Sequence, residues 1–264
     1  MAESRVVAAP PATAWVAFTL AAALIGLPLL TLLVRAPWRR LPTLLGTHEA
    51  QQALWLSLVT CLVSTLIVVA LGVPTAVVLA RSRGPWVEVA RALFSLPMVL
   101  PPVVAGLALL ATFGRWGLIG RPLSGAGIEI GFTTTAVVIA QVFVSLPFMI
   151  GSLEGSLRSS GGGHELVAAG LGAHPMRVFL TITIPVNAPA IAAAGALAFA
   201  RALGEFGATL TFAGSLPGVT RTLPLEIYLL RETDSDLALA LSLVLLAVAA
   251  VLVIATSRWR GVRG

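Results

Sequence analysis

Long apolar runs without a charged residue are the feature of this sequence that most constrains its fold. A helix rises about 1.5 Å per residue, so about 20 apolar residues cross the hydrocarbon core of a bilayer, which is about 30 Å thick. Runs of that length cover residues 12–34, 53–80, 92–114, 130–153, 178–200 and 237–257. Apolar character resumes beyond Arg201 and Glu205, so we place the fifth helix at about 188–209, with both charges inside it. The sequence therefore predicts an all-α fold, a polytopic membrane helical bundle of about six transmembrane helices.

The composition agrees with a membrane protein and excludes a water-soluble enzyme or binding domain. Of the 264 residues, 58% are hydrophobic and 11% are charged, and the mean hydropathy is +0.98. Average soluble domains carry about 25% charged residues. The first run is longer than the roughly 7–15 apolar residues of a secretory signal. We therefore expect residues 1–49 to contain a retained membrane helix followed by an external loop.

Arginine supplies all 17 positive charges, and a sequence without lysine cannot contain a Walker A nucleotide-binding loop. The net charge is +6, but the arginines lie between apolar runs, where anionic lipid headgroups explain them better than nucleic acid does. With the N-terminus inside the cell, nine arginines fall on the cytoplasmic side and seven outside. This bias favours that orientation only slightly.

No catalytic or metal-binding motif is complete in the sequence. His164 and Glu165 begin an H-E-x-x-H zinc motif, but Ala168 stands where its second histidine belongs. Cys61 is the only cysteine, so neither a disulfide within the chain nor a thiolate zinc site can form. We expect a chain that is not an enzyme and that binds no metal and no cofactor.

Prolines interrupt the third apolar run. Pro97, Pro101 and Pro102 follow closely on one another, and the last two remove backbone donors in succession, so this run cannot be one regular helix. Transporters place interrupted helices where they line the substrate path or move. A static kink filled by neighbouring helices is an equally good interpretation.

Arg201 and Glu205 are the charged pair of the fifth run. Their four-residue spacing places them on one helix face, where a salt bridge lowers the free-energy cost of charge at membrane depth. Gly204 and Gly207 beside them permit close approach of another helix or of a solute. Charges in a membrane span indicate function, but a purely structural pair is the alternative.

The loop between the fourth and fifth runs predicts two short amphipathic helices. Apolar residues recur between residues 165 and 180. Gly172 suits the left-handed residue that ends a first helix, and Pro175 suits the first turn of a second. Two such helices fit a groove on a partner protein, whereas an amphipathic loop resting on the membrane is the alternative.

This loop resembles the EAA signature of binding-protein-dependent ABC importer permeases. The second half of that signature reads G-x9-I-x-L-P. Gly172, Ile182 and Pro185 match it at the same spacing, with Ile184 in place of the usual leucine. The resemblance identifies the loop as the segment through which such permeases contact their ATPase.

The first half of the signature departs from the family pattern. Ala168 matches, but Leu166 stands at the signature glutamate and Val167 at the first alanine, while Glu165 lies one residue early. The acidic contact expected with the partner is therefore weakened, although the identity of the loop is kept.

Within that family the chain resembles permeases for oxyanions, and those for molybdate in particular. The resemblance is carried by residues 96–110, 200–214 and 216–224, and it extends over about residues 50–257. Permeases for sulfate, thiosulfate and tungstate share much of it, so these anions are the alternatives.

The resemblance implies the fold of a type I ABC importer permease in the inner (plasma) membrane of a bacterial cell. Residues 1–264 then form a single transmembrane domain, with a permease core at 50–257 and a cytoplasmic coupling loop at about 154–184. The implied partners are two ABC ATPase subunits, a second permease copy in a homodimer, an extracytoplasmic substrate-binding protein, the lipid bilayer and the oxyanion substrate, with no nucleic acid. ATP hydrolysis then belongs to the ATPase chain.

The resemblance also implies two sites. The ATPase-coupling loop comprises Glu165, Ala168, Gly172, Ala173, His174, Pro175, Arg177, Ile182 and Pro185. The translocation pathway comprises Pro97, Pro101, Pro102, Arg201, Gly204, Glu205 and Gly207. An ion-driven secondary carrier is the rival from another class, but six spans and one already-paired intramembrane glutamate argue against it. A membrane scaffold that transports nothing is a further alternative.

Overall fold

A computed structural model gives the backbone of residues 11–261 and the side chains of residues 11–254. Residues 1–10 and 262–264 of the expected single domain lie outside the described residues. Within the described part, every regular element is helical. In chain order the elements are α1 (Ala12–Arg35), α2 (Leu41–Leu45), α3 (His48–Arg81), α4 (Pro85–Val99), α5 (Pro102–Phe113), α6 (Gly120–Gly125), α7 (Thr134–Ser159), α8 (Gly163–Gly170), α9 (Pro175–Val178), a π-helical turn η1 (Phe179–Thr183), α10 (Ile184–Leu203), α11 (Gly207–Ala213), α12 (Leu223–Thr233) and α13 (Ser235–Gly261).

The membrane-spanning helices confirm the expected all-α bundle. Five helical stretches are long and apolar enough to cross a bilayer, namely α1, α3, α7, the continuous stretch from α9 to α10, and α13. The pair α4 and α5 makes a sixth span if it is counted as one, and it bends by 113° at its break. The described residues thus contain five or six candidate spans, in agreement with the expected number, and the third is interrupted as the prolines predict.

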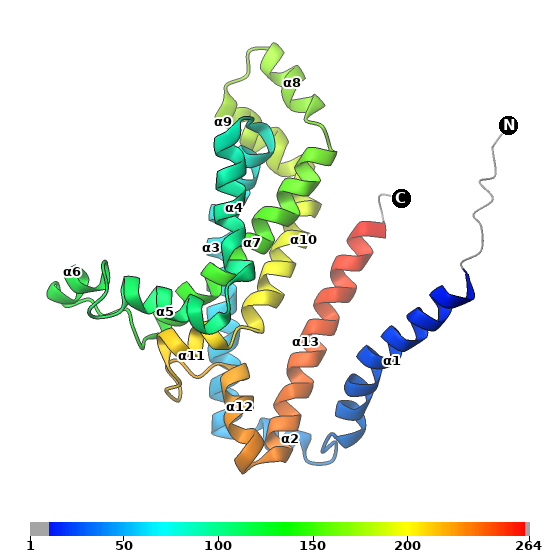
Figure 1. Cartoon of the computed structure of the whole chain (residues 1–264), viewed down its shortest axis with the longest axis vertical. Helices are drawn as coiled ribbons and strands as arrows, with labels where there is room; N and C mark the ends of the chain where they lie inside the picture. The colour runs from blue at the N-terminus through cyan, green and yellow to red at the C-terminus, as the bar shows by residue number, and fades with distance from the viewer. Residues whose placement is uncertain (1–10, 262–264) are drawn as a thin grey trace.

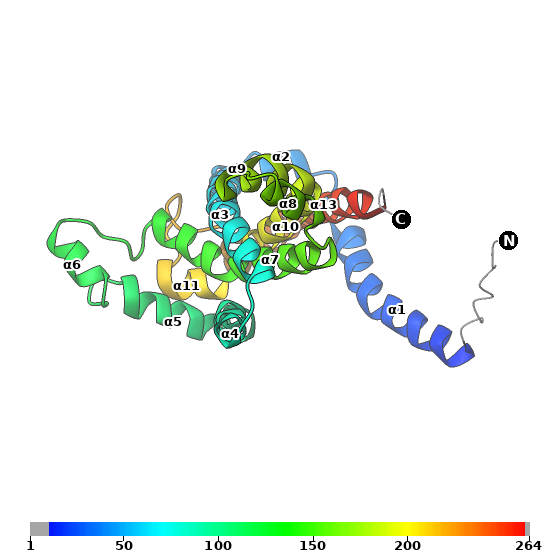
Figure 2. The same ribbon diagram turned by 90° about the horizontal axis from the view of Figure 1, so that it is seen from above.

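Helices α3, α7 and α10 form the centre of the bundle (Figures 1 and 2). Their contact is built from Val68, Ala76, Met149, Leu153 and Ala194 among other buried residues. Small residues let the backbones approach closely, as is typical of helix contacts in membranes. Helix α1 stands apart from this core, since none of its residues is buried and it contacts the rest of the chain mainly through α13.

The predicted position of the fifth helix is wrong at both ends. Helical structure begins at Pro175 and ends at Leu203, rather than running from about 188 to 209. The π-helical turn carries the chain from α9 into α10 without a break, which accounts for the early start. Gly204 leaves the helix, and Phe206 has a non-helical φ of −133°, so Glu205 lies beyond α10 and α11 begins separately.

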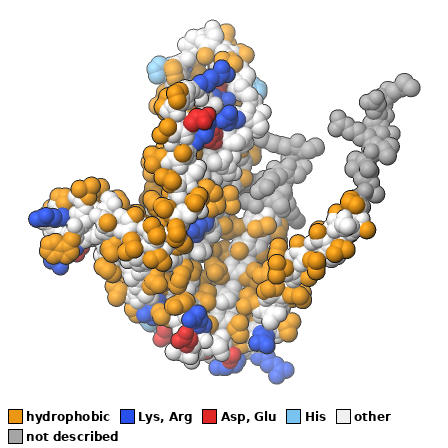
Figure 3. Space-filling view, in the orientation of Figure 1, with side chains coloured by type: hydrophobic (Ala, Val, Ile, Leu, Met, Phe, Trp, Pro, Cys, Tyr) orange, Lys and Arg blue, Asp and Glu red, His pale blue; other side chains and the backbone are white. Residues whose placement is uncertain are grey.

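Charged side chains gather at the two ends of the molecule and on the projecting part that carries α6, and apolar ones cover most of the surface between the ends (Figure 3). Helices α8 and α9 lie at one end (top of Figure 1), together with the start of α4. Helices α2 and α12 lie at the other end. This distribution matches a bundle whose middle is embedded in lipid and whose ends meet water and headgroups.

Candidate coupling loop and translocation pathway

The loop between α7 and α10 contains the two predicted short helices. Helix α8 ends just before Gly172, whose φ of +81° is the left-handed conformation expected of a residue that terminates a helix. Pro175 opens α9, and the Nδ1 atom of His174 accepts a hydrogen bond of 3.3 Å from the Met176 amide. Glycine and proline therefore fix the sharp corner between α8 and α9.

Five large apolar side chains of this loop lie open to solvent in the single chain. They are Leu166 (72% exposed), Val167 (66%), Leu171 (84%), Met176 (58%) and Leu180 (55%). Large apolar groups that gather on one exposed loop, outside the central core, form a surface of the kind that docks on another protein. Leu166 and Val167 occupy the positions at which the chain departs from the family signature.

Glu165 does not point outward from the loop. Its carboxylate forms an ion pair with Arg81, with 2.8 Å between Oε2 and the arginine Nε, and its Oε1 accepts a 2.9 Å hydrogen bond from the Thr183 hydroxyl. Only 19% of the Glu165 side chain is exposed. The acidic group nearest to the signature position is therefore engaged within the chain.

The remaining residues assigned to the loop fall on both of its helices and on the turn between them. Ala168 lies in α8 and is half-buried, and Ala173 lies half-buried in the turn. Arg177 is exposed in α9, where its carbonyl accepts a hydrogen bond from the Thr181 hydroxyl. Ile182 belongs to the π-helical turn, and Pro185 is exposed near the start of α10.

The interrupted third span places the three expected prolines in different positions. Pro97 lies inside α4, Pro101 lies between the two helices, and Pro102 is the first residue of α5, where its missing amide hydrogen is tolerated. Pro101 and Pro102 are both exposed in the single chain. Helix α5 consequently leaves the direction of the bundle and runs sideways (Figure 2).

Arg201 and Glu205 form the predicted salt bridge, with 2.8 Å between the arginine Nη2 and the glutamate Oε2. Glu205 also binds the start of α11, because its Oε1 accepts a 2.8 Å hydrogen bond from the Ala208 amide. One carboxylate therefore joins the end of α10 to the first turn of α11. The Glu205 side chain is 1% exposed and that of Arg201 is 30% exposed, so the pair presents its cationic half outward.

Glycines bring α11 against α5 beside this ion pair. A Cβ atom on Gly207 would lie 2.6 Å from the Cβ atom of Pro102, and one on Gly106 would lie 2.6 Å from the Cβ atom of Thr211. Gly204, in contrast, has only its own helix nearby and is exposed. The structure thus brings Pro102, Gly207 and the Arg201–Glu205 pair together at the break of the third span.

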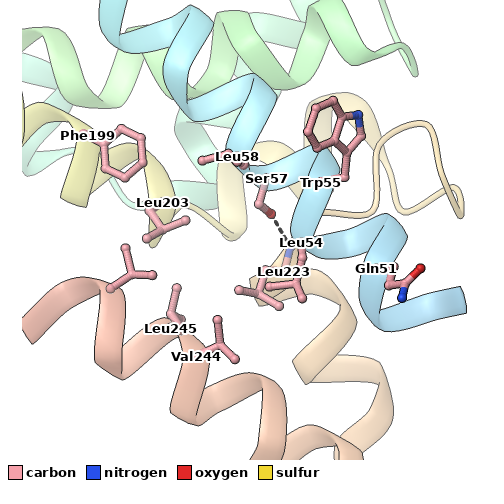
Figure 4. Close-up of a pocket in the computed structure, with 11 residues that line it drawn as sticks. Gln51, Leu54, Trp55, Ser57, Leu58, Phe199, Leu203, Leu223, Val244 and Leu245 are labelled. Carbon is pink, nitrogen blue, oxygen red and sulfur yellow. Dashed lines mark hydrogen bonds between the residues drawn. The ribbon is translucent and has the colours of Figure 1, made fainter. Parts of the chain in front are cut away.

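An apolar cavity of about 470 Å³ lies between α3, α10, α12 and α13 (Figure 4). Phe199, Leu203 and Leu245 face into it, and the Ser57 hydroxyl at its edge accepts a 2.6 Å hydrogen bond from the Leu223 amide. A dehydrated oxyanion needs several N–H or O–H donors. The walls of this cavity offer very few, so we do not assign the anion path to it.

Sequence reasoning missed an arginine and glutamate network at the end of the bundle that carries α8. Arg81 pairs with Glu165, and Arg91 pairs with Glu154 at 2.6 Å between Nε and Oε1. Arg81, Arg91 and Glu154 directly adjoin apolar runs in the sequence, but the pairing depends on tertiary contacts between distant segments. Within residues 11–254, no group of three or more histidine, cysteine or acidic side chains is placed to bind a metal ion.

A bundle of apolar helices, with one broken span and a short-helix loop at one end, is the architecture of a multi-pass membrane transport permease. Residues 72–260 match the protein family described as "Binding-protein-dependent transport system inner membrane component". The chain belongs to this family, and it is an inner-membrane permease of the ABC importer class. Permeases of this class work together with ATPase subunits and a substrate-binding protein.

Curated relatives are similar over most of the chain. It is 55% identical over 230 residues to the molybdenum transport system permease protein ModB of Mycobacterium bovis, which covers 87% of each protein. It is 40% identical over 188 residues to the protein of the same name from Escherichia coli K12, covering 71% of this chain and 82% of that one.

Among solved structures, the chain is similar to a permease chain of a bacterial alginate ABC transporter in complex with an alginate pentasaccharide-bound periplasmic protein. The TM-score is 0.68 at 16% identity, covering 92% of this chain and 91% of that one. At this identity the likeness establishes the fold.

Proposed function

We propose that this chain forms the translocation pathway of an ABC importer for molybdate. The observation that carries the proposal is the 55% identity to a molybdenum transport permease over 87% of both chains. The chain would act as a non-catalytic subunit, in two identical copies, with ATP hydrolysed by separate ATPase subunits. An extracytoplasmic binding protein would deliver the anion.

The pathway is assigned to the break between α4 and α5 and to the junction of α10 and α11. Pro101 and Pro102 are exposed there, and Gly207 lets α11 lie directly against Pro102. Interrupted helices of transporters line the substrate path, because their free backbone groups can contact the substrate and the break lets the two halves move. These features support the assignment of Pro97, Pro101, Pro102, Arg201, Gly204, Glu205 and Gly207 to the pathway.

The Arg201–Glu205 pair suits an anion that must pass without being trapped. Arg201 is the more exposed partner, so a dianion would meet a guanidinium, while Glu205 behind it offsets the charge. A lone buried arginine would hold a dianion far more strongly, because electrostatic attraction rises steeply in a medium of low dielectric constant. The Arg201–Glu205 pair would therefore attract the dianion and still allow it to dissociate.

The coupling function is assigned to α8 and α9. Their exposed apolar side chains, above all Leu171 and Leu166, would dock in a groove of the ATPase. The corner at Gly172 would hold the two helices at a fixed angle, so that closure of the ATPase pair moves the whole loop. Glu165, Ala168, Ala173, His174, Pro175, Arg177, Ile182 and Pro185 would support or border that surface.

Reconstituted transport tests the proposal. The permease, its ATPase subunits and the binding protein are placed in liposomes, and uptake of labelled molybdate is measured with ATP and with an excess of unlabelled molybdate, tungstate or sulfate. We expect ATP-dependent uptake that molybdate suppresses fully and sulfate hardly at all. Uptake that tungstate or sulfate suppresses more strongly than molybdate would reassign the anion.

The same assay separates transport from rival classes and tests the ion pair. Uptake that continues without ATP while an ion gradient is held would indicate a secondary carrier, and no uptake with no copurifying ATPase would indicate a scaffold. Arg201→Ala should lower uptake more than it lowers copurification with the ATPase. Parallel losses of both would mean that Arg201 serves only to hold the fold.

A further inference from the structure

We infer that Arg81 is a positioning residue of the coupling loop: its ion pair with Glu165 fixes α8 to the bundle and transmits movement of the loop to the pathway helices. The inference rests on the coupling function proposed above and adds a residue from a distant segment to it. The argument starts from the contacts of the Arg81 guanidinium.

Arg81 is the last residue of α3 and contacts two other elements. Its Nε atom lies 2.8 Å from the Glu165 carboxylate of α8, and its Nη1 donates a 3.2 Å hydrogen bond to the carbonyl of Leu157 in α7. A planar guanidinium has several donors in fixed directions, so it can hold two acceptors at once in a defined geometry. Helix α8 is therefore attached to the two central helices of the bundle through one side chain.

Glu165 extends the same connection towards α10. Its second carboxylate oxygen accepts a hydrogen bond of 2.9 Å from the hydroxyl of Thr183, the last residue of the π-helical turn. That turn continues directly into α10, whose far end carries Arg201. A displacement of α8 would therefore pull on the start of the helix that reaches the proposed pathway.

A second arginine links the same end of the bundle to the broken span. Arg91 in α4 pairs with Glu154 of α7 at 2.6 Å, and its Nη2 donates a 3.0 Å hydrogen bond to the Leu79 carbonyl of α3. Helix α4 ends at the proline break. Charge-assisted hydrogen bonds thus join α8 to the central helices α3 and α7 and to the pathway helices α4 and α10. Such bonds are stronger and more directional than neutral ones.

The loop also leaves space for this arrangement. Gly162, the residue before α8, has a φ of +73°, and a Cβ atom there would lie 2.9 Å from the guanidinium carbon of Arg81. Its neighbour Gly161 has a similar φ of +77°, but a Cβ atom there would meet nothing within 4 Å. The two glycines therefore differ in their contact with Arg81 and hardly in φ.

That difference provides a matched experiment in the reconstituted complex. Gly162→Ala and Gly161→Ala each place a side chain at a similar positive φ, which disfavours alanine, but only the first displaces the guanidinium. The measured quantity is the amount of molybdate taken up per ATP hydrolysed, normalised to assembled complex. We expect Gly162→Ala to lower this ratio by about fivefold, a typical size for coupling between sites, and Gly161→Ala to leave it near the wild-type value.

Charge variants test the pair itself. Arg81→Gln and Glu165→Gln should each lower the ratio while ATP hydrolysis continues, and the double variant Arg81→Glu with Glu165→Arg should recover part of it. Arg83→Gln is the control, because Arg83 is exposed and no ion pair of Arg83 occurs among the described residues. A merely structural ion pair would lower uptake, hydrolysis and assembly together, with no change in the ratio.

The outcomes separate this inference from the proposed function. If the wild-type complex shows coupled uptake and Arg81→Gln, Glu165→Gln and Gly162→Ala keep its ratio, the positioning role of Arg81 is overturned and the coupling function stands. A lowered ratio in these variants but not in Gly161→Ala or Arg83→Gln supports the role. If the wild-type complex shows no ATP-dependent uptake, the proposed function fails first.

Discussion

Glu205 makes two contacts at the junction of α10 and α11, and they have different chemical requirements. The ion pair with Arg201 needs the negative charge of the carboxylate, whereas the hydrogen bond from the Ala208 amide needs only an acceptor oxygen. A carboxylate next to the first turn of a helix also interacts favourably with the helix dipole. The residue therefore supports the junction even apart from its charge pair.

Two substitutions at this position separate the contacts. Glu205→Ala should lower the free energy of unfolding by about 2 kcal/mol, because a nearly buried ion pair loses one partner and α11 loses its acceptor. Glu205→Gln should lower it by about 1 kcal/mol, since the amide oxygen still accepts from Ala208. Thermal unfolding of the purified protein in detergent measures both. Equal losses would show that the Ala208 bond contributes nothing.

Residue-level prediction from sequence succeeded where the contacts are local. The spacing of Arg201 and Glu205 predicted their ion pair, and the glycine and proline of the loop predicted the corner at Gly172. The inward position of Glu165 was not predictable, because its partner Arg81 belongs to a distant segment. A family signature indicates which residue types occur in a loop, but it does not indicate their orientation.

The element most directly tied to the proposed coupling is the α8–α9 corner. Gly172→Glu should leave membrane insertion intact while it uncouples ATP hydrolysis from uptake, because Gly172 needs a left-handed φ and a bulky side chain there strains the corner. Gly172→Asn is the control, since asparagine tolerates that conformation at helix ends. Uptake and hydrolysis are measured together in liposomes. Wild-type uptake by the glutamate variant would refute the role of the corner.

The contact between α5 and α11 is a second element that a small substitution tests. Gly106→Ala should lower the free energy of unfolding by about 1–3 kcal/mol, because the new methyl group would overlap Thr211 and the Ala208 carbonyl. Gly151→Ala in α7 is the control, since a Cβ atom there meets nothing within 4 Å and alanine favours a helix. Detergent unfolding of both variants is compared with the wild type. A neutral Gly106→Ala would mean that the two helices are not held this closely.

At the element scale, apolar length predicted the number of spans, and consecutive prolines predicted the break in the third. Length alone did not place the fifth helix, because the π-helical turn prolongs it at the start and Gly204 ends it before Glu205. The sequence pattern also did not predict the 113° angle of the bend between α4 and α5. Helix α5 packs against α11 at Gly106 and Gly207, and this tertiary contact is not visible in the sequence pattern.

In the whole molecule, the proposed docking surface and the proposed pathway lie apart. The exposed apolar loop lies at one end of the bundle, the proposed pathway lies at the proline break, and long helices connect them (Figure 1). The expectation that residues 1–264 act as one transmembrane domain remains a prediction, as do the second permease copy and the cytoplasmic position of the loop. The cytoplasmic position of the loop follows if α8 and α9 dock on an ATPase.

Site-directed crosslinking tests that docking most directly. Cys61 is the only cysteine in the sequence and is buried, so Cys61→Ala gives a background for single cysteines. Leu171→Cys in the loop and Leu118→Cys near α6 are equally exposed, at 84% each, and provide a matched pair. With a short bifunctional reagent in intact membranes, Leu171→Cys should capture an ATPase subunit and Leu118→Cys should not. Failure of Leu171→Cys to capture any ATP-hydrolysing subunit, in membranes that transport normally, would contradict the account.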